Sequence, residues 1–255
     1  MNKSSFCSRE WFSDNSFWEN YAALLFDKER WEEAPGTAAS IIAMAGIAKN
    51  SPILDMCCGP GRHALAMAEM TYKVVGVDIT EAFIVAARDS ADAMGLKNTE
   101  FINADARTWK RPGAFSLAIN LFTSFGYFDS MDEDLQMLKR LYESLAHGGV
   151  LIMELKGKEI AARDFMDGEW FERDGKTVLT QFEVQGAWEA IKHRWIIMDG
   201  MHKIDRCWIQ RLYSAQELKT LLEYAGFKNI SFFGSFDGSP YNQEALTMVA
   251  RAVKL

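Results

Sequence analysis

Residues Pro52–Asp78 read PILDMCCGPGRHALAMAEMTYKVVGVD, and the fold class follows from this stretch. The apolar run at its start predicts a buried strand, and Gly59 and Gly61 then predict a tight turn. Strong helix formers occupy residues 62–70, and a second apolar run ends at Asp78. Strand, glycine turn, helix, strand and acid in this order is typical of a nucleotide-binding βαβ unit. Small residues there let a cofactor approach the backbone, and the acid binds ribose hydroxyls.

The composition of the whole chain limits the classes of protein to which it can belong. The chain has 255 residues and a formal net charge of -7, which argues against nucleic acid as the main partner. It has no apolar run near the roughly 18 residues of a membrane helix, and its first residues lack a signal-peptide pattern. The four cysteines show no CxxC pair and no disulfide-scaffold spacing. We therefore expect a reduced, cytoplasmic protein with no metal and no membrane partner, while a homodimer stays open.

Strands and helices alternate along most of the chain. Strands are expected at 51–56, 73–78, 99–102, 115–121, 150–155, 228–236 and 245–253, and helices at 62–71, 81–94 and 132–146. Ser214 and Glu217 form a capping box that begins a late helix. Such alternation predicts an α/β fold, a Rossmann-like, seven-stranded, mostly parallel sheet with helices on both faces.

Two segments depart from this alternation. Residues 158–212 contain alternating strands around two hairpin signals, Asp174-Gly175 and Asp199-Gly200, and predict an antiparallel β insertion. The first 50 residues are rich in aromatic side chains at helical spacing, with a turn expected at Pro35-Gly36 and a helix from Thr37. The predicted organisation is an N-terminal helical lid segment (1–50), a cofactor-binding core (51–157 and 213–255) and a substrate cap (158–212). Packing of the N-terminal helix on the core is the alternative to a lid.

The glycine turn has a dinucleotide fingerprint, Gly59-x-Gly61-x-x-Ala64, which alone is a weak signal. Asp78 strengthens it because it follows the second strand, in the ribose position. Asn103-Ala104-Asp105 follows the third strand, where a carboxylate and a backbone amide can read the edge of an adenine.

These motifs together resemble those of the class I S-adenosylmethionine-dependent methyltransferases. ILDMCCGPG (53–61) is similar to their first motif, VGVD (75–78) to the second and NAD (103–105) to the third, and the resemblance covers roughly residues 51–155 and 212–253. It implies S-adenosylmethionine as cofactor and S-adenosylhomocysteine as product. Cys57 stands where the family often has a further glycine, and Asn120 where many members have an acid. The implied cofactor-binding residues are Asp55, Cys57, Gly59, Gly61, Arg62, Asp78, Ile79, Ala104, Asp105, Ala106, Asn120 and Leu121.

The resemblance leaves the methyl acceptor open. The aromatic N-terminus and the insertion predict a capped pocket for a small molecule methylated on N or O. Trp18 and Trp195 are expected in its walls, and no catalytic base is identified. Weak candidates for catalysis are Tyr21, Tyr127, His193, His202 and Arg211. The alternatives are an RNA or protein methyltransferase of the same fold, a nicotinamide-dependent dehydrogenase and a non-catalytic cofactor-binding protein.

Overall fold

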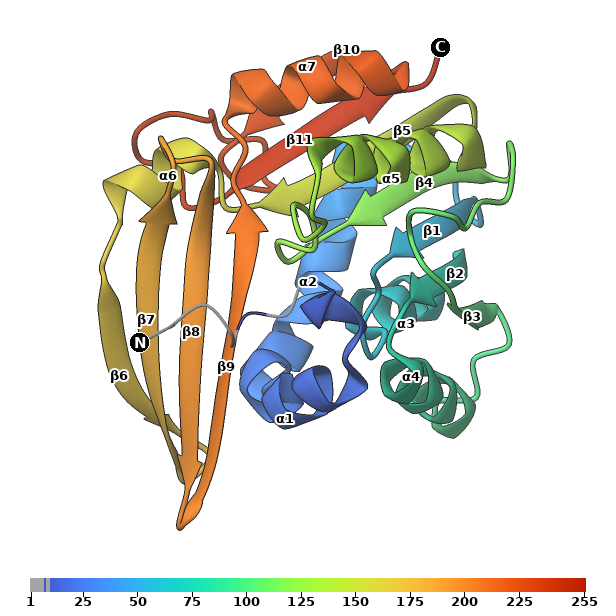
Figure 1. Ribbon diagram of the computed structural model, residues 1–255. Coiled ribbons are helices and arrows are strands. Elements are labelled where there is room, and N and C mark those ends of the chain that lie inside the picture. The colour runs from blue at the N-terminus through green and yellow to red at the C-terminus, as the bar shows by residue number, and fades with distance from the viewer. Residues whose placement is uncertain (1–6, 8–9) are drawn as a thin grey trace.

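The computed structural model describes residue 7 and residues 10–255. This part of the chain folds into a seven-stranded sheet with helices on both faces and a separate four-stranded sheet (Figure 1). The order in the larger sheet is β10-β11-β5-β4-β1-β2-β3, and β11 is antiparallel to both of its neighbours, whereas the other pairs are parallel. The predicted fold class is therefore confirmed. The strands of the larger sheet are β1 (Pro52–Met56), β2 (Lys73–Asp78), β3 (Thr99–Asn103), β4 (Phe115–Asn120), β5 (Leu145–Leu155), β10 (Lys228–Phe233) and β11 (Met248–Val253).

Helices cover both faces of this sheet and bury two apolar clusters. Residues of α5 and α7 join the cluster on one face, and residues of α2, α3 and α4 join the cluster on the other. Among the described residues, no helix is both long and apolar enough to cross a membrane. The helices are η1 (Trp11–Ser13), α1 (Asn15–Leu25), α2 (Lys28–Ala45), α3 (Arg62–Glu69), α4 (Glu81–Ala93), α5 (Met131–Ser144), α6 (Lys158–Arg163) and α7 (Ala215–Ala225).

The direction of strand addition reverses between β1 and β4. The chain adds β2 and β3 on one side of β1 and then returns to place β4 on the other side. Asp55 near the end of β1 is consequently paired with Gly76 of β2 and with Ile119 of β4. The carboxyl ends of β1 and β4 open a crevice at such a reversal, and ligands of open α/β sheets bind there.

The turn predicted at Pro35-Gly36 is wrong, because both residues lie inside α2. The helix begins earlier, where the Asp27 side chain accepts a hydrogen bond from the Arg30 N–H at 3.0 Å. Its buried residues, which include Ala34 and Ala38, form one apolar face that joins the cluster with α3. Burial of that face outweighs the hydrogen bond that a proline removes from a helix.

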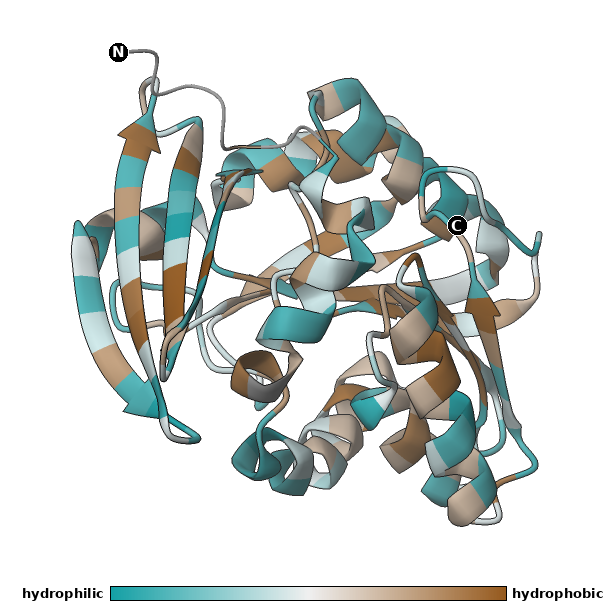
Figure 2. Cartoon of the chain, turned by 60° about the horizontal axis from the view of Figure 1, so that its bottom comes forward, coloured by the Kyte–Doolittle hydropathy of each residue, from teal (hydrophilic) through white to brown (hydrophobic). Residues whose placement is uncertain are grey.

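The smaller sheet, which we call the cap sheet, is antiparallel and follows α6. Its strands are β6 (Gly168–Arg173), β7 (Lys176–Gln185), β8 (Ala190–Asp199) and β9 (His202–Arg211). Hydrophobic and hydrophilic residues alternate along these strands (Figure 2), as expected of a sheet with one buried face. That face packs on η1 and α1, and Figure 1 shows α1 between the cap sheet and α4. The insertion leaves and rejoins the core at one place, where the Lys158 N–H donates to the Tyr213 carbonyl at 2.9 Å.

The prediction that the cysteines are reduced is wrong for Cys7 and Cys207, which form a disulfide. They are 200 residues apart in sequence. Cys7 also forms an isolated β-bridge with Cys207 of β9, a contact between distant residues that no spacing rule reveals. Cys57 and Cys58 are free.

Candidate functional site

The glycine turn after β1 is fixed against the end of β2. The N–H groups of Cys57 and Cys58 both donate to the Val77 carbonyl, at 2.7 and 3.1 Å. Cys57 and Gly59 have positive φ angles of 64° and 55°. Cys57 thus adopts the left-handed conformation in which glycine costs least, so the turn keeps its shape without a glycine there.

Asp78 closes this turn from the end of β2. Its Oδ2 accepts a hydrogen bond from the Gly59 N–H at 2.8 Å, and its Oδ1 accepts one from the Thr80 N–H at 2.9 Å. Burial raises the pKa of Asp78, and these backbone hydrogen bonds oppose the rise. Each carboxylate oxygen has a further lone pair available for a ligand hydroxyl.

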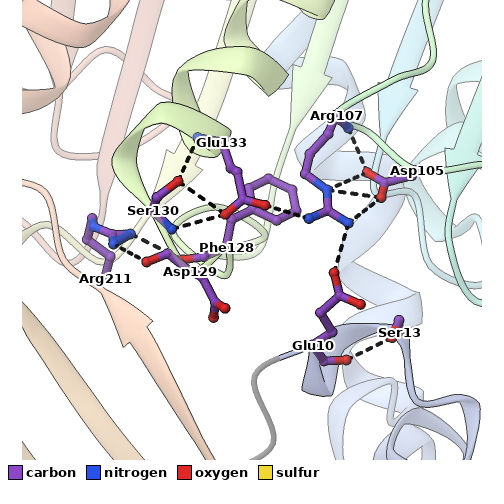
Figure 3. Close-up of polar contacts among 9 residues, drawn as sticks. All are labelled: Glu10, Ser13, Asp105, Arg107, Phe128, Asp129, Ser130, Glu133 and Arg211. Atoms are coloured by element: carbon purple, nitrogen blue, oxygen red, sulfur yellow. Dashed lines mark hydrogen bonds and ion pairs between the residues drawn. The ribbon is translucent and has the colours of Figure 1, made fainter.

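Asp105 is held by Arg107, two residues along the chain. The Arg107 Nε lies 3.0 Å from Oδ2 and 3.1 Å from Oδ1 of Asp105, and its Nη2 lies 2.6 Å from Oδ2 (Figure 3). Burial acts to raise the pKa of Asp105, but the hydrogen bonds and charge of Arg107 outweigh it and hold that pKa below its usual range. Asp105 therefore presents an ionised carboxylate in a fixed orientation.

Asp55 and Arg62 are buried at the same end of the sheet without a carboxylate–guanidinium pair between them. Asp55 is 3% exposed, its Oδ2 has no partner among the described residues, and burial with the nearby Asp78 charge raises its pKa to about 7. Arg62 is 7% exposed, and its Nη1 donates to the Arg30 carbonyl at 3.1 Å. The free Oδ2 of Asp55 and the Arg62 guanidinium, which pairs with no carboxylate of the described residues, could together hold the ammonium and carboxylate of an amino acid group.

These residues open onto a cavity of about 280 Å³, which we call the main cavity. Among the residues predicted to bind the cofactor, those that line it are Asp55, Cys57, Gly59, Arg62, Asp78, Ile79, Ala104, Asp105, Ala106 and Leu121. Two others, Gly61 and Asn120, lie outside its lining. A Cβ on Gly61 would lie 3.0 Å from that of Ala87, so this glycine allows close packing of α4. Asn120 donates to the Met56 carbonyl at 2.9 Å and thereby joins the ends of β4 and β1.

The rest of the lining is largely aromatic and comes from segments far apart in sequence. Sequence reasoning missed most of it, because single aromatic residues carry no pattern that separates a cavity wall from a core. These residues include Phe12, Leu25, Phe26, Phe83, Phe122, Phe125 and Phe128. His63 also lines the main cavity, and burial together with the nearby Arg62 lowers its pKa to about 3, so its imidazole is neutral at pH 7.

The loop after β4 supplies much of this wall in a constrained conformation. Phe122 and Thr123 both have positive φ, at 56° and 58°, which is costly for residues other than glycine. The Phe122 N–H donates to Oε2 of Glu154 at 2.6 Å. The Gln210 side chain donates to the carbonyls of Thr123 at 3.1 Å and Phe125 at 3.2 Å. The loop is thus held by both β5 and β9.

Only some of the residues expected around the acceptor reach the main cavity. Trp18 and Tyr127 line it. Burial, with smaller effects of Cys57 and Asp78, raises the pKa of Tyr127 well above its usual value, so its phenol stays protonated.

The remaining candidates lie elsewhere. The Tyr21 hydroxyl donates to the Trp195 carbonyl at 3.2 Å inside the packing of α1 on the cap sheet. His193 stacks on Trp208 at 5.0 Å, and burial lowers the pKa of His193 to about 4. His202 is exposed at the β8–β9 turn.

Arg211 does not line the main cavity, and its guanidinium makes structural contacts. Its Nη1 lies 3.2 Å from Oδ2 of the buried Asp134 and also donates to the Phe128 carbonyl at 3.2 Å. Its Nη2 donates to the Asp129 carbonyl at 3.0 Å (Figure 3). Arg211 therefore ties β9 to the start of α5.

Comparisons with known proteins find similarity to methyltransferases. A family model described as "Methyltransferase domain" matches residues 53–149. The chain is 40% identical to a 23S rRNA (uracil(1939)-C(5))-methyltransferase, RlmD, of Marinomonas posidonica over 25% of this chain and 15% of that protein. It is 26% identical to the dTDP-3-amino-3,4,6-trideoxy-alpha-D-glucopyranose N,N-dimethyltransferase of Streptomyces venezuelae over 50% of this chain and 52% of that one. It thus spans less than two thirds of the length of either relative.

A solved structure extends the likeness across the chain. The S-adenosylmethionine-dependent methyltransferase from Clostridium acetobutylicum superposes with a TM-score of 0.77, covering 94% of this chain and 98% of that one at 15% identity. At this identity the match shows the shared fold.

Proposed function

We propose that this chain, which is a class I S-adenosylmethionine-dependent methyltransferase by its domain and fold, methylates a small-molecule acceptor on N or O. S-adenosylmethionine supplies an electrophilic methyl group on a sulfonium. The observation that carries the proposal is the arrangement of Asp55, Arg62, Asp78 and Asp105 around one cavity at the point where strand order reverses.

The groups around the main cavity suit the parts of this cofactor. In this proposal the free lone pairs of Asp78 bind the ribose hydroxyls. Arg62 pairs with the carboxylate of the methionine part, and Asp55 faces its ammonium. Burial leaves Asp55 Oδ2 without a partner, which is costly unless a ligand supplies one.

The remaining residues of the proposed cofactor site bring the backbone of the chain close to the cofactor or surround its adenine. Gly59 allows the backbone to approach the cofactor. The adenine lies beside Ala104 and Asp105, whose carboxylate is already ionised and oriented by Arg107. Gly61 and Asn120 act indirectly by shaping the turn and the end of β4. The further contacts would come from Cys57, Ile79, Ala106 and Leu121.

A closed, aromatic wall supports a small acceptor. Methyl transfer is an in-line displacement that benefits from alignment and from exclusion of water. Phe12, Trp18, Tyr127 and Phe128 provide such a wall, and aromatic faces stabilise cationic groups. The Streptomyces relative is named for an amino sugar substrate, which is consistent with an amine acceptor. Tyr127 remains protonated and would act as a hydrogen-bond donor.

An RNA acceptor is the second candidate, because three relatives are named for 23S rRNA. Their matches cover only 25%, 29% and 39% of the chain. The net charge of -7 gives little general attraction to phosphates.

Calorimetric titration of the whole chain tests the cofactor. We expect binding of S-adenosylhomocysteine and none of NADH. Tighter binding of NADH would support a dehydrogenase, and absence of S-adenosylhomocysteine binding would refute the proposal.

Turnover then tests the acceptor. The chain is incubated with methyl-labelled S-adenosylmethionine and either a panel of small amines and alcohols or a 23S rRNA transcript. Label transferred to small molecules supports the proposal, and label found only in RNA contradicts it. A chain that binds cofactor but labels neither class is best described as a cofactor-binding protein.

A further inference from the structure

We propose that Arg107 is a positioning residue that holds the N-terminal segment, residues 10–26, closed over the main cavity. This inference rests on the proposed function, because the ligand that it retains is the cofactor. Neither the fingerprint nor the aromatic pattern of the sequence points to Arg107.

Arg107 connects three parts of the chain through its guanidinium (Figure 3). It grips Asp105 in the loop after β3, with a shortest distance of 2.6 Å. Its Nη1 lies 2.7 Å from Oε1 of Glu133 at the start of α5. Its Nη2 lies 3.5 Å from Oε1 of Glu10 in the N-terminal segment. Asp105 lines the main cavity, and Glu10 and Glu133 lie close in sequence to Phe12 and Phe128, which also line it.

The guanidinium also covers two rings that line this cavity. Its Cζ lies 5.4 Å from the ring centre of Phe12 and 4.9 Å from that of Phe128. The two rings meet edge to face at 5.2 Å. Arginine stacks favourably on aromatic faces, so Arg107 supports the contact by which the N-terminal segment closes on the loop after β4.

The three ion pairs of Arg107 differ in strength, and this difference suits a closure that can reverse. Its side chain is 18% exposed, and the short contacts to Asp105 and Glu133 fix it to the core. Glu10 is 62% exposed and its contact is long, which is typical of a weak ion pair. The contacts with Asp105 and Glu133 therefore keep Arg107 in place, while the contact with Glu10 can break and reform.

Closure matters because the N-terminal segment covers the cavity. Phe12, Trp18, Leu25 and Phe26 all line it. The Phe26 ring packs so closely on the glycine turn that a Cβ on Gly59 would lie 3.2 Å from it. Exchange of a ligand bound on this turn thus requires the segment to move. Arg107 would then set how fast S-adenosylhomocysteine leaves.

Stopped-flow displacement of S-adenosylhomocysteine, followed by tryptophan fluorescence, tests this role. Glu10→Gln removes only the weak ion pair, and we expect the dissociation rate to rise about two- to fivefold. Arg107→Lys keeps the charge but loses the planar fork, and we expect a rise of about tenfold. The double variant should release ligand no faster than Arg107→Lys alone, because both changes act on one contact.

Arg111→Lys is the matched control. Arg111 also makes a two-pronged pair, with Glu100 at 2.8 and 2.9 Å, and its Cζ lies 5.7 Å from the Trp109 ring centre, yet neither Arg111 nor Trp109 lines the main cavity. An unchanged rate in Arg111→Lys supports the assignment. Equal rates in the wild type and Arg107→Lys, or an equal rise in both lysine variants, would overturn it.

Hydrogen exchange separates this inference from the proposed function. In the ligand-free chain, Arg107→Lys should speed amide exchange in α1 more than in α5 and α7. If the wild type binds no S-adenosylhomocysteine, the proposed function fails while selective exchange in α1 would still support the closure. Uniform acceleration in all three helices would mean a merely structural role and would overturn it.

Discussion

The two sides of the main cavity are built in different ways. The core side consists of turns at the ends of neighbouring strands. Hydrogen bonds join these turns, such as the one from the Gly59 N–H to the Asp78 carboxylate, 19 residues apart. The opposite side is lined by the N-terminal segment, which packs on the cap sheet, and we call this packed layer the roof. There the Tyr21 hydroxyl donates a hydrogen bond to the Trp195 carbonyl, 174 residues away in sequence, and Cys7 forms a disulfide with Cys207, 200 residues away.

The core side depends on hydrogen bonds to the backbone, whereas the roof depends on side-chain packing. On the core side, hydrogen bonds between backbone N–H groups and carboxylates fix the geometry. Few residue types are therefore permitted at each position. The roof is an aromatic cluster, in which Trp208 lies within about 6 Å of several other rings. Many combinations of aromatic residues could fill the same space. We therefore expect the core side to govern cofactor affinity and the roof to govern stability and acceptor choice.

The largest expected effect is on the roof, in Trp208→Ala. Trp208 is 8% exposed and its ring centre lies 5.4 Å from that of Trp11. Loss of this buried ring should lower the free energy of unfolding by about 3–5 kcal/mol, measured by urea denaturation. Trp170→Ala is the control, because Trp170 is 69% exposed. Comparable losses in both variants would contradict the central place of Trp208 in the roof.

A smaller effect is expected on the core side, in Asp78→Ala. The affinity for S-adenosylhomocysteine should weaken by about 1–3 kcal/mol, because charge-assisted hydrogen bonds to the ribose are lost and the turn at Gly59 loses its acceptor. Calorimetry on this variant and on Asp89→Ala, an exposed acid of α4, measures the difference. Unchanged affinity in Asp78→Ala would refute the ribose role and blur the contrast between the two sides.

The smallest expected effect concerns the pH dependence due to Asp55. Its pKa is about 7 in the folded chain and about 4 when unfolded, so the folded state binds the extra proton between these values. Raising the pH from 6 to 8 should therefore remove about 1 kcal/mol of stability.

The comparison variant for this effect is Asp55→Asn, which lacks the titrating group. Its free energy of unfolding relative to that of the wild type should become more favourable as the pH rises, when both are measured by denaturation at each pH. A difference that stays constant across this range would mean that Asp55 is ionised throughout.

Sequence reasoning succeeded where contacts are local and repeated. The glycine turn, the capping box at Ser214 and the parallel sheet follow from short patterns that the structure contains. The helix across Pro35 was missed because apolar packing overrides the local preference of proline. The pocket positions expected of His193 and Arg211 differ from those observed, since the side on which a strand residue lies depends on register and on what the sheet packs against.

The common entry and exit point of the insertion has an evolutionary consequence. Because Lys158 and Tyr213 are hydrogen-bonded neighbours, an ancestral core could gain, lose or exchange residues 158–212 without stretching its own sheet. The aromatic packing and the disulfide add a condition, since they link the cap sheet to the N-terminal segment and to Cys7 just before it. We expect the two to have diversified as a pair, with changes in one selecting changes in the other while the glycine turn stayed the same.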